Sequence, residues 1–129
     1  MESKKSSHSQ TLIQECRNKL LNIRRDLIHR MSLSWTLPPE EKVSGDEIDQ
    51  AVAQGAENIF MLHQNRMRSQ LLEIESALRR IHEGNFGICE ETEELIEEKR
   101  LRALPHTTLS IEGAELREAM KKKYASQTS

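Results

Sequence analysis

The feature that most constrains the fold is a set of residues that recurs in alternating steps of four and three between positions 60 and 81. Its members are Phe60, Gln64, Met67, Leu71, Ile74, Leu78 and Ile81. This spacing places them on one side of an α-helix and repeats over three heptads, which is typical of a helix that packs along a second helix. The pattern therefore predicts a long helix that runs from about Asp46 or Ile48 to His82.

A matching stripe lies earlier in the chain, between about Ser9 and Leu33. It consists of Ile13, Cys16, Leu20, Ile23, Leu27 and Met31, in a stretch that contains neither glycine nor proline. Pro38 and Pro39 then break the pattern, because a proline and the residue before it disfavour helix. The short connection forces the two helices to run antiparallel. We expect a hairpin over residues 10–83 with its tip near residues 38–51, preceded by a flexible N-terminus at residues 1–9.

A change of pattern follows the hairpin. Gly84 to Gly87 are turn-forming residues that end the second helix, and residues 84–129 are predicted to form a small lobe with a last helix at Ile111–Tyr124. Lys121 to Lys123 would complement the negative end of that helix. The candidate lobe core consists of Phe86, Ile88, Leu95, Ile96, Leu101, Leu104, Leu109 and Ile111. The predicted fold class is mainly all-α, a long antiparallel helical hairpin (a coiled coil) plus a small C-terminal lobe and a C-terminal helix.

Composition excludes several classes of function. The net charge of −2 and the 3% of aromatic residues leave no basic surplus for phosphates and few rings for bases, so we expect no direct sequence-specific DNA binding. Cys16 and Cys89 fall in different elements, which suits reduced thiols. No leader-like or membrane-spanning apolar run is present, so we expect a cytoplasmic protein without membrane association. No catalytic triad, phosphate loop or metal box is visible, and we expect no enzyme activity.

The predicted hairpin tip carries two carboxylates. Asp46 and Asp49 lie three residues apart where the second helix should begin, on nearly one face and near the positive end of the helix dipole. One interpretation is helix capping, with Asp46 as N-cap and Asp49 at the third helical position. The other is a functional tip that reaches a site containing a metal or basic groups. The two interpretations are compatible.

The segment Asp46-x-x-Asp49-x-Ala51 resembles the coiled-coil tip of the DksA/TraR family. Residues 81–90, Arg100 to Pro105 and Thr108 to Glu112 resemble the same family's lobe, in the same order. The resemblance implies a transcription regulator that binds RNA polymerase through its secondary channel, as a monomer when bound. Asp46, Asp49 and Ala51 would then act near the catalytic centre and modulate promoter complexes.

The family lobe carries a structural zinc site with the pattern Cys-x2-Cys-x17-Cys-x2-Cys. In register, the four positions here are Cys89, Thr92, Ser110 and Gly113, so only one thiol remains. We therefore expect a degenerate zinc finger, with no metal and no cofactor. Cys89 would be a buried thiol, and His82 and His106 would be ordinary surface or packing residues.

Two further expectations concern the response to guanosine tetraphosphate and the alternative functions. The family's guanosine tetraphosphate site uses basic residues, whereas the matching positions here are Glu73, Leu104 and Ala114, which argues against a response to this alarmone. A Gre-like stimulator of transcript cleavage, with tip carboxylates that hold magnesium, is one alternative function. A helical scaffold or dimerisation protein without a polymerase role is another.

Overall fold

The computed structural model describes residues 7–36 and 47–127. Four helices make up most of this part of the chain: α1 (Gln10–Thr36), α2 (Glu47–Glu83), α3 (Glu98–Ala103) and α4 (Ile111–Gln127). Within these ranges there is no strand, only one isolated bridge between Ile88 and Leu95. The prediction of a mainly all-α fold is confirmed. None of the described helices is long and apolar enough to cross a membrane.

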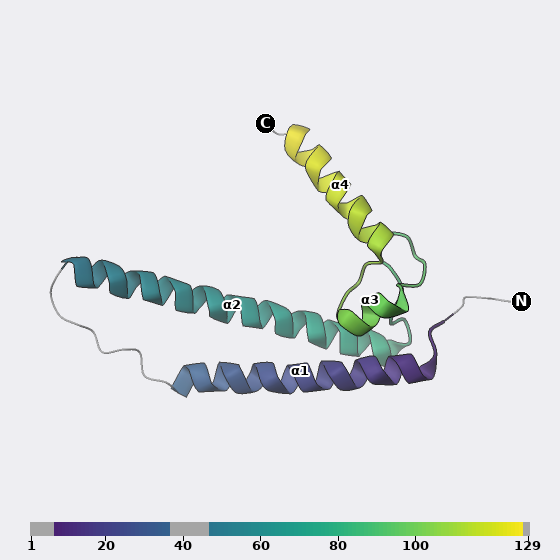
Figure 1. The fold of residues 1–129 in the computed structure, drawn as a ribbon, viewed down its shortest axis with the longest axis horizontal. Coiled ribbons are helices and arrows are strands. Elements are labelled where there is room, and N and C mark those ends of the chain that lie inside the picture. Colours follow the sequence, from purple (N-terminus) through teal and green to yellow (C-terminus); the bar gives the residue numbers. More distant parts are fainter. Residues whose placement is uncertain (1–6, 37–46, 128–129) are drawn as a thin grey trace, which may run out of the picture.

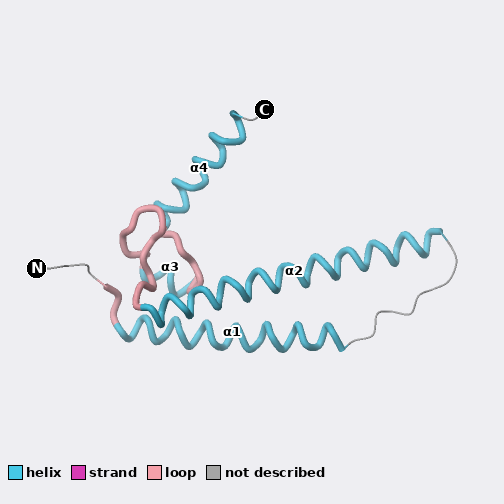
Figure 2. Tube along the Cα trace, turned by 180° about the vertical axis from the view of Figure 1, so that it is seen from behind, coloured by secondary structure: helices cyan, strands magenta, loops and turns pink. Residues whose placement is uncertain are grey.

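The two long helices form an antiparallel hairpin, with α1 and α2 side by side and the lobe at one end (Figures 1 and 2). Leu20 and Leu27 of α1 and Ile74 of α2 are buried in the seam, as the heptad spacing predicts. Ala77, which the predicted stripe did not include, is buried with them. Burying a large aliphatic side chain contributes about 1.5–3 kcal/mol, so these contacts stabilise the pairing. The seam prediction fails at Ile23 and at Phe60, which are both exposed.

The N-terminal end of α1 and the C-terminal end of α2, which lie next to the lobe, are both capped. The Ser9 hydroxyl accepts a hydrogen bond from the backbone N–H of Leu12 at 3.1 Å, which satisfies a free donor in the first turn of α1. At the other end, Gly84 has a φ of +86°, and the N–H groups of Gly84 and Asn85 donate to the carbonyls of Ile81 and Arg80. This is a Schellman motif, and it requires the left-handed backbone that glycine adopts without strain.

The first turns of α2 extend beyond the last described residues of α1 (Figure 1). Figure 1 shows α2 running on past the end of α1, and the side chains between Glu47 and His63 are exposed with few exceptions. The prolines and Asp46 of the predicted tip lie outside the described residues. Glu47 and Asp49 do fall in the first turn of α2, near the positive end of its dipole.

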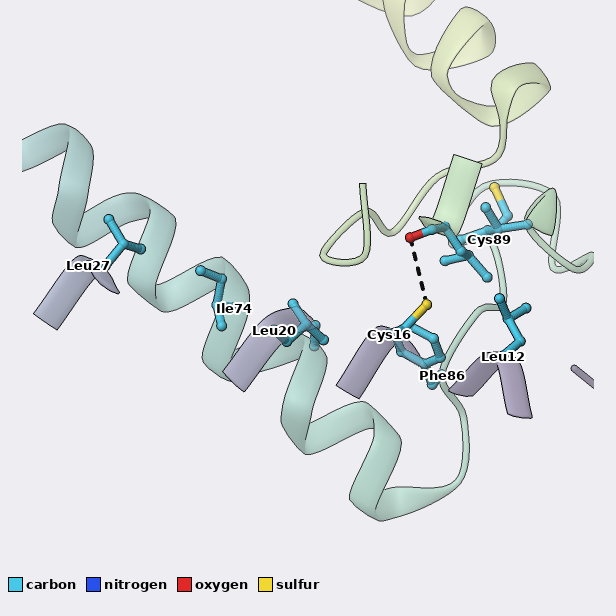
Figure 3. Packing of buried hydrophobic residues seen from close by; sticks show 10 residues of the cluster. Leu12, Cys16, Leu20, Leu27, Ile74, Phe86 and Cys89 are labelled. Carbon is cyan, nitrogen blue, oxygen red and sulfur yellow. Dashed lines mark hydrogen bonds between the residues drawn. The ribbon is translucent and has the colours of Figure 1, made fainter. Parts of the chain in front are cut away.

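The lobe core depends on α1. Phe86, Cys89, Ile96 and Leu101 form one buried cluster with Leu12 and Cys16, as Figure 3 shows for the labelled residues. The predicted lobe core was therefore right in part. It was wrong for Ile88, Leu104 and Ile111, which are exposed, because side chains of α1 occupy the space that a self-contained lobe would fill with its own residues.

The last helix projects away from the hairpin (Figures 1 and 2). Only its first turn is packed, where Gly113 is buried. The Arg117 guanidinium fastens the next turn by ion pairs with Glu91 at 2.7 Å and Glu90 at 3.4 Å. α4 extends three residues beyond the predicted Tyr124, so the lysines at 121–123 do not form its last turn.

Candidate functional site

The acidic tip is the first candidate site. Asp49 is half-buried and Ala51 is exposed, both in the first two turns of α2, while Asp46 lies outside the described residues. At about 1.5 Å per residue, the 37 residues of α2 separate this tip from the lobe by about 55 Å. The tip is thus an acidic helix end on a rod, far from the lobe.

The second candidate site is the lobe cluster, defined as Cys89, Thr92, Ser110 and Gly113. The sequence assigned these positions to the ligands of a family zinc site, and the fold brings them together. The Ser110 hydroxyl donates to the Cys89 sulfur at 3.4 Å, and the Gly113 N–H donates to the Ser110 hydroxyl at 3.0 Å. Ser110 therefore acts as the N-cap of α4 and as a hydrogen-bond donor to the thiol.

Two loops position this cluster. The Cys89 N–H donates to the Glu94 carbonyl at 2.8 Å, and the Glu93 N–H returns a bond to the Cys89 carbonyl at 2.9 Å. Glu93 closes the turn with a φ of +62°, a left-handed conformation that is strained for a residue with a side chain. The Glu90 N–H then donates to the Thr108 carbonyl at 2.9 Å, which ties this loop to the segment that carries Ser110.

Gly113 is the tightest point of the cluster. A Cβ at this position would lie 2.4 Å from the Cys89 sulfur and 3.3 Å from the Ser110 hydroxyl. The sulfur thus fills the space that a side chain of residue 113 would need. At this pair of positions one thiol packs directly against a glycine.

The electrostatics of the cluster favour the thiolate. Burial raises the pKa of the Cys89 thiol, but hydrogen bonds from the side chains and backbones of Ser110 and Thr92 outweigh burial and lower the pKa to about 6. Cys16 behaves in the opposite way, since burial raises the pKa of its thiol. Both cysteines are free thiols, as predicted.

The donor set does not fit zinc. A structural zinc site needs four ligands, usually thiolates and imidazoles, whereas the lobe cluster offers one thiol, two hydroxyls and no side chain at Gly113. No group of three or more histidine, cysteine or acidic side chains suited to a metal occurs in the described ranges. His106 instead lies 3.8 Å from Glu73, and its backbone carbonyl accepts from Arg80 at 3.4 Å.

Side chains of the hairpin hold the lobe in place. The Lys19 ammonium donates to the Arg102 carbonyl at 2.7 Å, and the Cys16 thiol donates to the Leu101 carbonyl at 3.7 Å, drawn as a dashed line in Figure 3. These carbonyls lie at the C-terminal end of α3, where a cation is favourable. This role of Lys19 could not be predicted from the sequence, because nothing in the local pattern pairs it with a residue 83 positions away.

The positions that match the family's alarmone site carry no cation. Glu73 and Leu104 are exposed and Ala114 is half-buried. The Arg100 guanidinium, which lies nearby in sequence, donates to the Leu109 carbonyl at 2.7 Å. None of the three matching side chains could pair with a phosphate.

Comparison with known proteins finds similarity to one family profile and to several proteins. The profile of the family described as "Prokaryotic dksA/traR C4-type zinc finger" matches residues 84–119. The chain is 35% identical over 82 residues to the RNA polymerase-binding transcription factor DksA of Caulobacter vibrioides, an alignment that covers 64% of this chain and 58% of that protein. It is 32% identical over 108 residues to an uncharacterized protein of Aquifex aeolicus, covering 81% of this chain and 74% of that one.

A solved structure is similar over nearly the whole chain. The transcription factor DksA2 from Pseudomonas aeruginosa matches with a TM-score of 0.79 and 26% identity, covering 94% of both chains. The likeness therefore includes the hairpin as well as the lobe.

Proposed function

Because this chain belongs to the DksA/TraR family, we propose that it is a transcription regulator that binds RNA polymerase. The observation that carries the proposal is the rod itself, an antiparallel hairpin with an acidic helix end about 55 Å from a compact lobe. A rod of this length can reach a buried site through a channel while the lobe stays outside. Relatives named as RNA polymerase-binding transcription factors support the same conclusion.

The acidic tip would be the acting end. In this proposal α2 enters the secondary channel of the polymerase, and Asp46, Asp49 and Ala51 lie near its catalytic centre. Asp49 would supply the essential negative charge, Asp46 would add to it, and the small side chain of Ala51 would keep the approach unobstructed. The helix dipole favours carboxylates at this end, so capping and function coexist there.

In vitro transcription from a ribosomal promoter tests the tip. We expect the wild type to change transcript yield, and Asp49→Asn to bind polymerase without this effect. Glu57→Gln is the matched control, since it removes an exposed carboxylate two turns further along the same helix and should behave as the wild type. An Asp49→Asn variant with full activity would overturn the proposed role of the tip.

The same reactions separate the alternatives. Release of short 3′ fragments from a stalled transcript in the presence of the protein would favour a Gre-like stimulator of cleavage. A wild type that neither binds polymerase nor alters yield would leave a scaffold without a polymerase role. Addition of guanosine tetraphosphate should not enhance the effect, because Glu73, Leu104 and Ala114 offer it no cation.

We further propose that the lobe works without zinc. Its support is the lobe cluster, in which the Ser110 hydroxyl and the backbone of α4 take the places of metal ligands. Protein purified with zinc in the medium should carry no stoichiometric metal, and a chelator should leave its melting temperature unchanged. The triple variant Thr92→Cys, Ser110→Cys, Gly113→Cys restores four thiols on the same loops and should bind one zinc. One tightly held zinc per wild-type chain would refute this part.

A further inference from the structure

The tip half of α2 carries a second apolar stripe, separate from the seam that faces α1 in the described part of the hairpin. It consists of Ile48, Val52, Ile59 and Leu62, which are 71%, 67%, 58% and 57% exposed. With Gly55 in the middle, these positions follow one another in steps of four, three, four and three, like a seam. We call this set the outer stripe. It lies roughly a third of a turn around the helix from the seam that faces α1.

Within the described residues, no contact explains why position 55, at the centre of the outer stripe, is a glycine. A glycine inside a helix weakens it relative to alanine, and a Cβ at this position would meet nothing within 4 Å. The chain therefore forgoes a side chain where its own fold leaves room for one. A glycine in the middle of an apolar stripe is what a second helix needs in order to approach closely.

The outer stripe is self-complementary about Gly55. If a second copy lies antiparallel across it, Ile48 of one copy falls beside Leu62 of the other, and Val52 beside Ile59. Such a two-fold arrangement uses one surface twice and closes the interface. Nothing in the outer stripe is left without an apolar counterpart in this register.

The charges at the two ends of the outer stripe fit the same register. Glu47 and Asp49 flank its beginning, and His63 and Arg66 follow its end. In an antiparallel pair, each acidic end lies beside the partner's basic end, whereas a parallel pair would place like charges together. Opposite charges across an interface select orientation more than they add affinity.

We propose that the outer stripe is a self-association surface through which two copies pair antiparallel, with their helices crossing at Gly55. The apolar stretch is only about 21 Å long, so the pair should be weak, with a dissociation constant on the order of tens of micromolar. The pairing does not depend on the function proposed above. One consequence of the pairing does rest on that function. Because Ile48 adjoins Asp49, the dimer covers the acidic tip and keeps it from polymerase.

Sedimentation velocity over a wide concentration range, up to about 1 mM, tests the pairing. The wild type should shift from monomer to dimer, while Ile59→Glu and Gly55→Leu should remain monomeric. Met61→Glu is the matched control, because Met61 is 57% exposed on the same helix but lies off the outer stripe; this variant should still dimerise. Gly55→Leu should melt no lower than the wild type, so loss of the dimer cannot be ascribed to unfolding.

Three outcomes would overturn the proposal: a wild type that stays monomeric at the highest concentration, equal loss of dimer in Met61→Glu and Ile59→Glu, or an undiminished dimer in Gly55→Leu. Adding polymerase should dissociate the dimer. A dimer that persists beside active polymerase would refute the covering of the tip, whereas an inactive wild type would refute the proposed function and leave the pairing standing.

Discussion

Gly113→Ala should destabilise the protein through a single contact. The new Cβ would lie 2.4 Å from the Cys89 sulfur, whereas nonbonded heavy atoms rest at about 3.5–4.0 Å. Cys89 is only 1% exposed and is held by Ser110, so the overlap of more than about 1 Å has to be relieved by displacing packed atoms. Overpacking of this kind costs about 1–3 kcal/mol.

The helix partly offsets this cost. Replacing glycine by alanine within a helix contributes up to about 1 kcal/mol of stability, so with the full offset the net loss should be about 0–2 kcal/mol. Denaturant unfolding followed by circular dichroism measures it, as a lower midpoint at an unchanged slope. Gly55→Ala is the matched control. No atom lies within 4 Å of the added Cβ there, so this variant should gain stability.

A double-mutant cycle ties the loss to the sulfur. Cys89→Ala removes the atom that the new Cβ meets, so in that background Gly113→Ala should cost nothing or stabilise. The coupling between the two substitutions should reach at least about 1 kcal/mol. If the losses in unfolding free energy of the two single variants simply add in the double variant, Gly113 is required for another reason, such as its backbone conformation. The explanation by packing against the sulfur would then be wrong.

Three other perturbations test different parts of the molecule. Gln64 is 4% exposed, and its side-chain amide has no hydrogen-bond partner in the described part of the chain; Gln64→Leu should therefore raise the unfolding free energy by about 1–3 kcal/mol, and a lower melting temperature would contradict this. Lys19→Met removes the donor to the Arg102 carbonyl while keeping most of the aliphatic chain; we expect a loss of about 0.5–1 kcal/mol and faster amide exchange in α3, and unchanged exchange would count against the cap. The lowered pKa of Cys89, about 6 against an ordinary 9.0, means that the thiolate stabilises the folded state fully above pH 9 and that this contribution is lost as the pH falls through 6. The difference in unfolding free energy between the wild type and Cys89→Ala should thus grow from pH 6 to pH 9, by at most about 1.4 kcal/mol per unit, and a flat difference would refute the shift.

The hairpin could be predicted because its signal is local. The steps of three and four that end at Ile81 determine which faces of α1 and α2 meet, and Gly84 marks the end of α2 in the sequence. The same pattern failed at Phe60, which belongs to the predicted stripe but is exposed. Periodicity shows which face of a helix is apolar, but it does not show what covers that face.

The lobe was harder to predict, since its short apolar runs have no period. Leu104 and Ile111 are as apolar as Leu101, yet they are exposed while Leu101 is buried. The difference comes from Leu12 and Cys16, which lie more than 80 residues earlier. The family register did identify the lobe cluster correctly, but the packing of Cys89 against Gly113 becomes visible only in three dimensions.

The bond from Lys19 to the end of α3 has a consequence for how this lobe can be reused. The segment that matches the family profile, residues 84–119, contains neither Lys19 nor the α1 side chains that complete its core. It is not an autonomous module, and an excised fragment would expose Phe86 and Leu101 to water. A chimera that exchanges lobes between relatives would have to transfer the first turns of α1 as well. The exchangeable structural unit therefore consists of two segments that are far apart in the sequence.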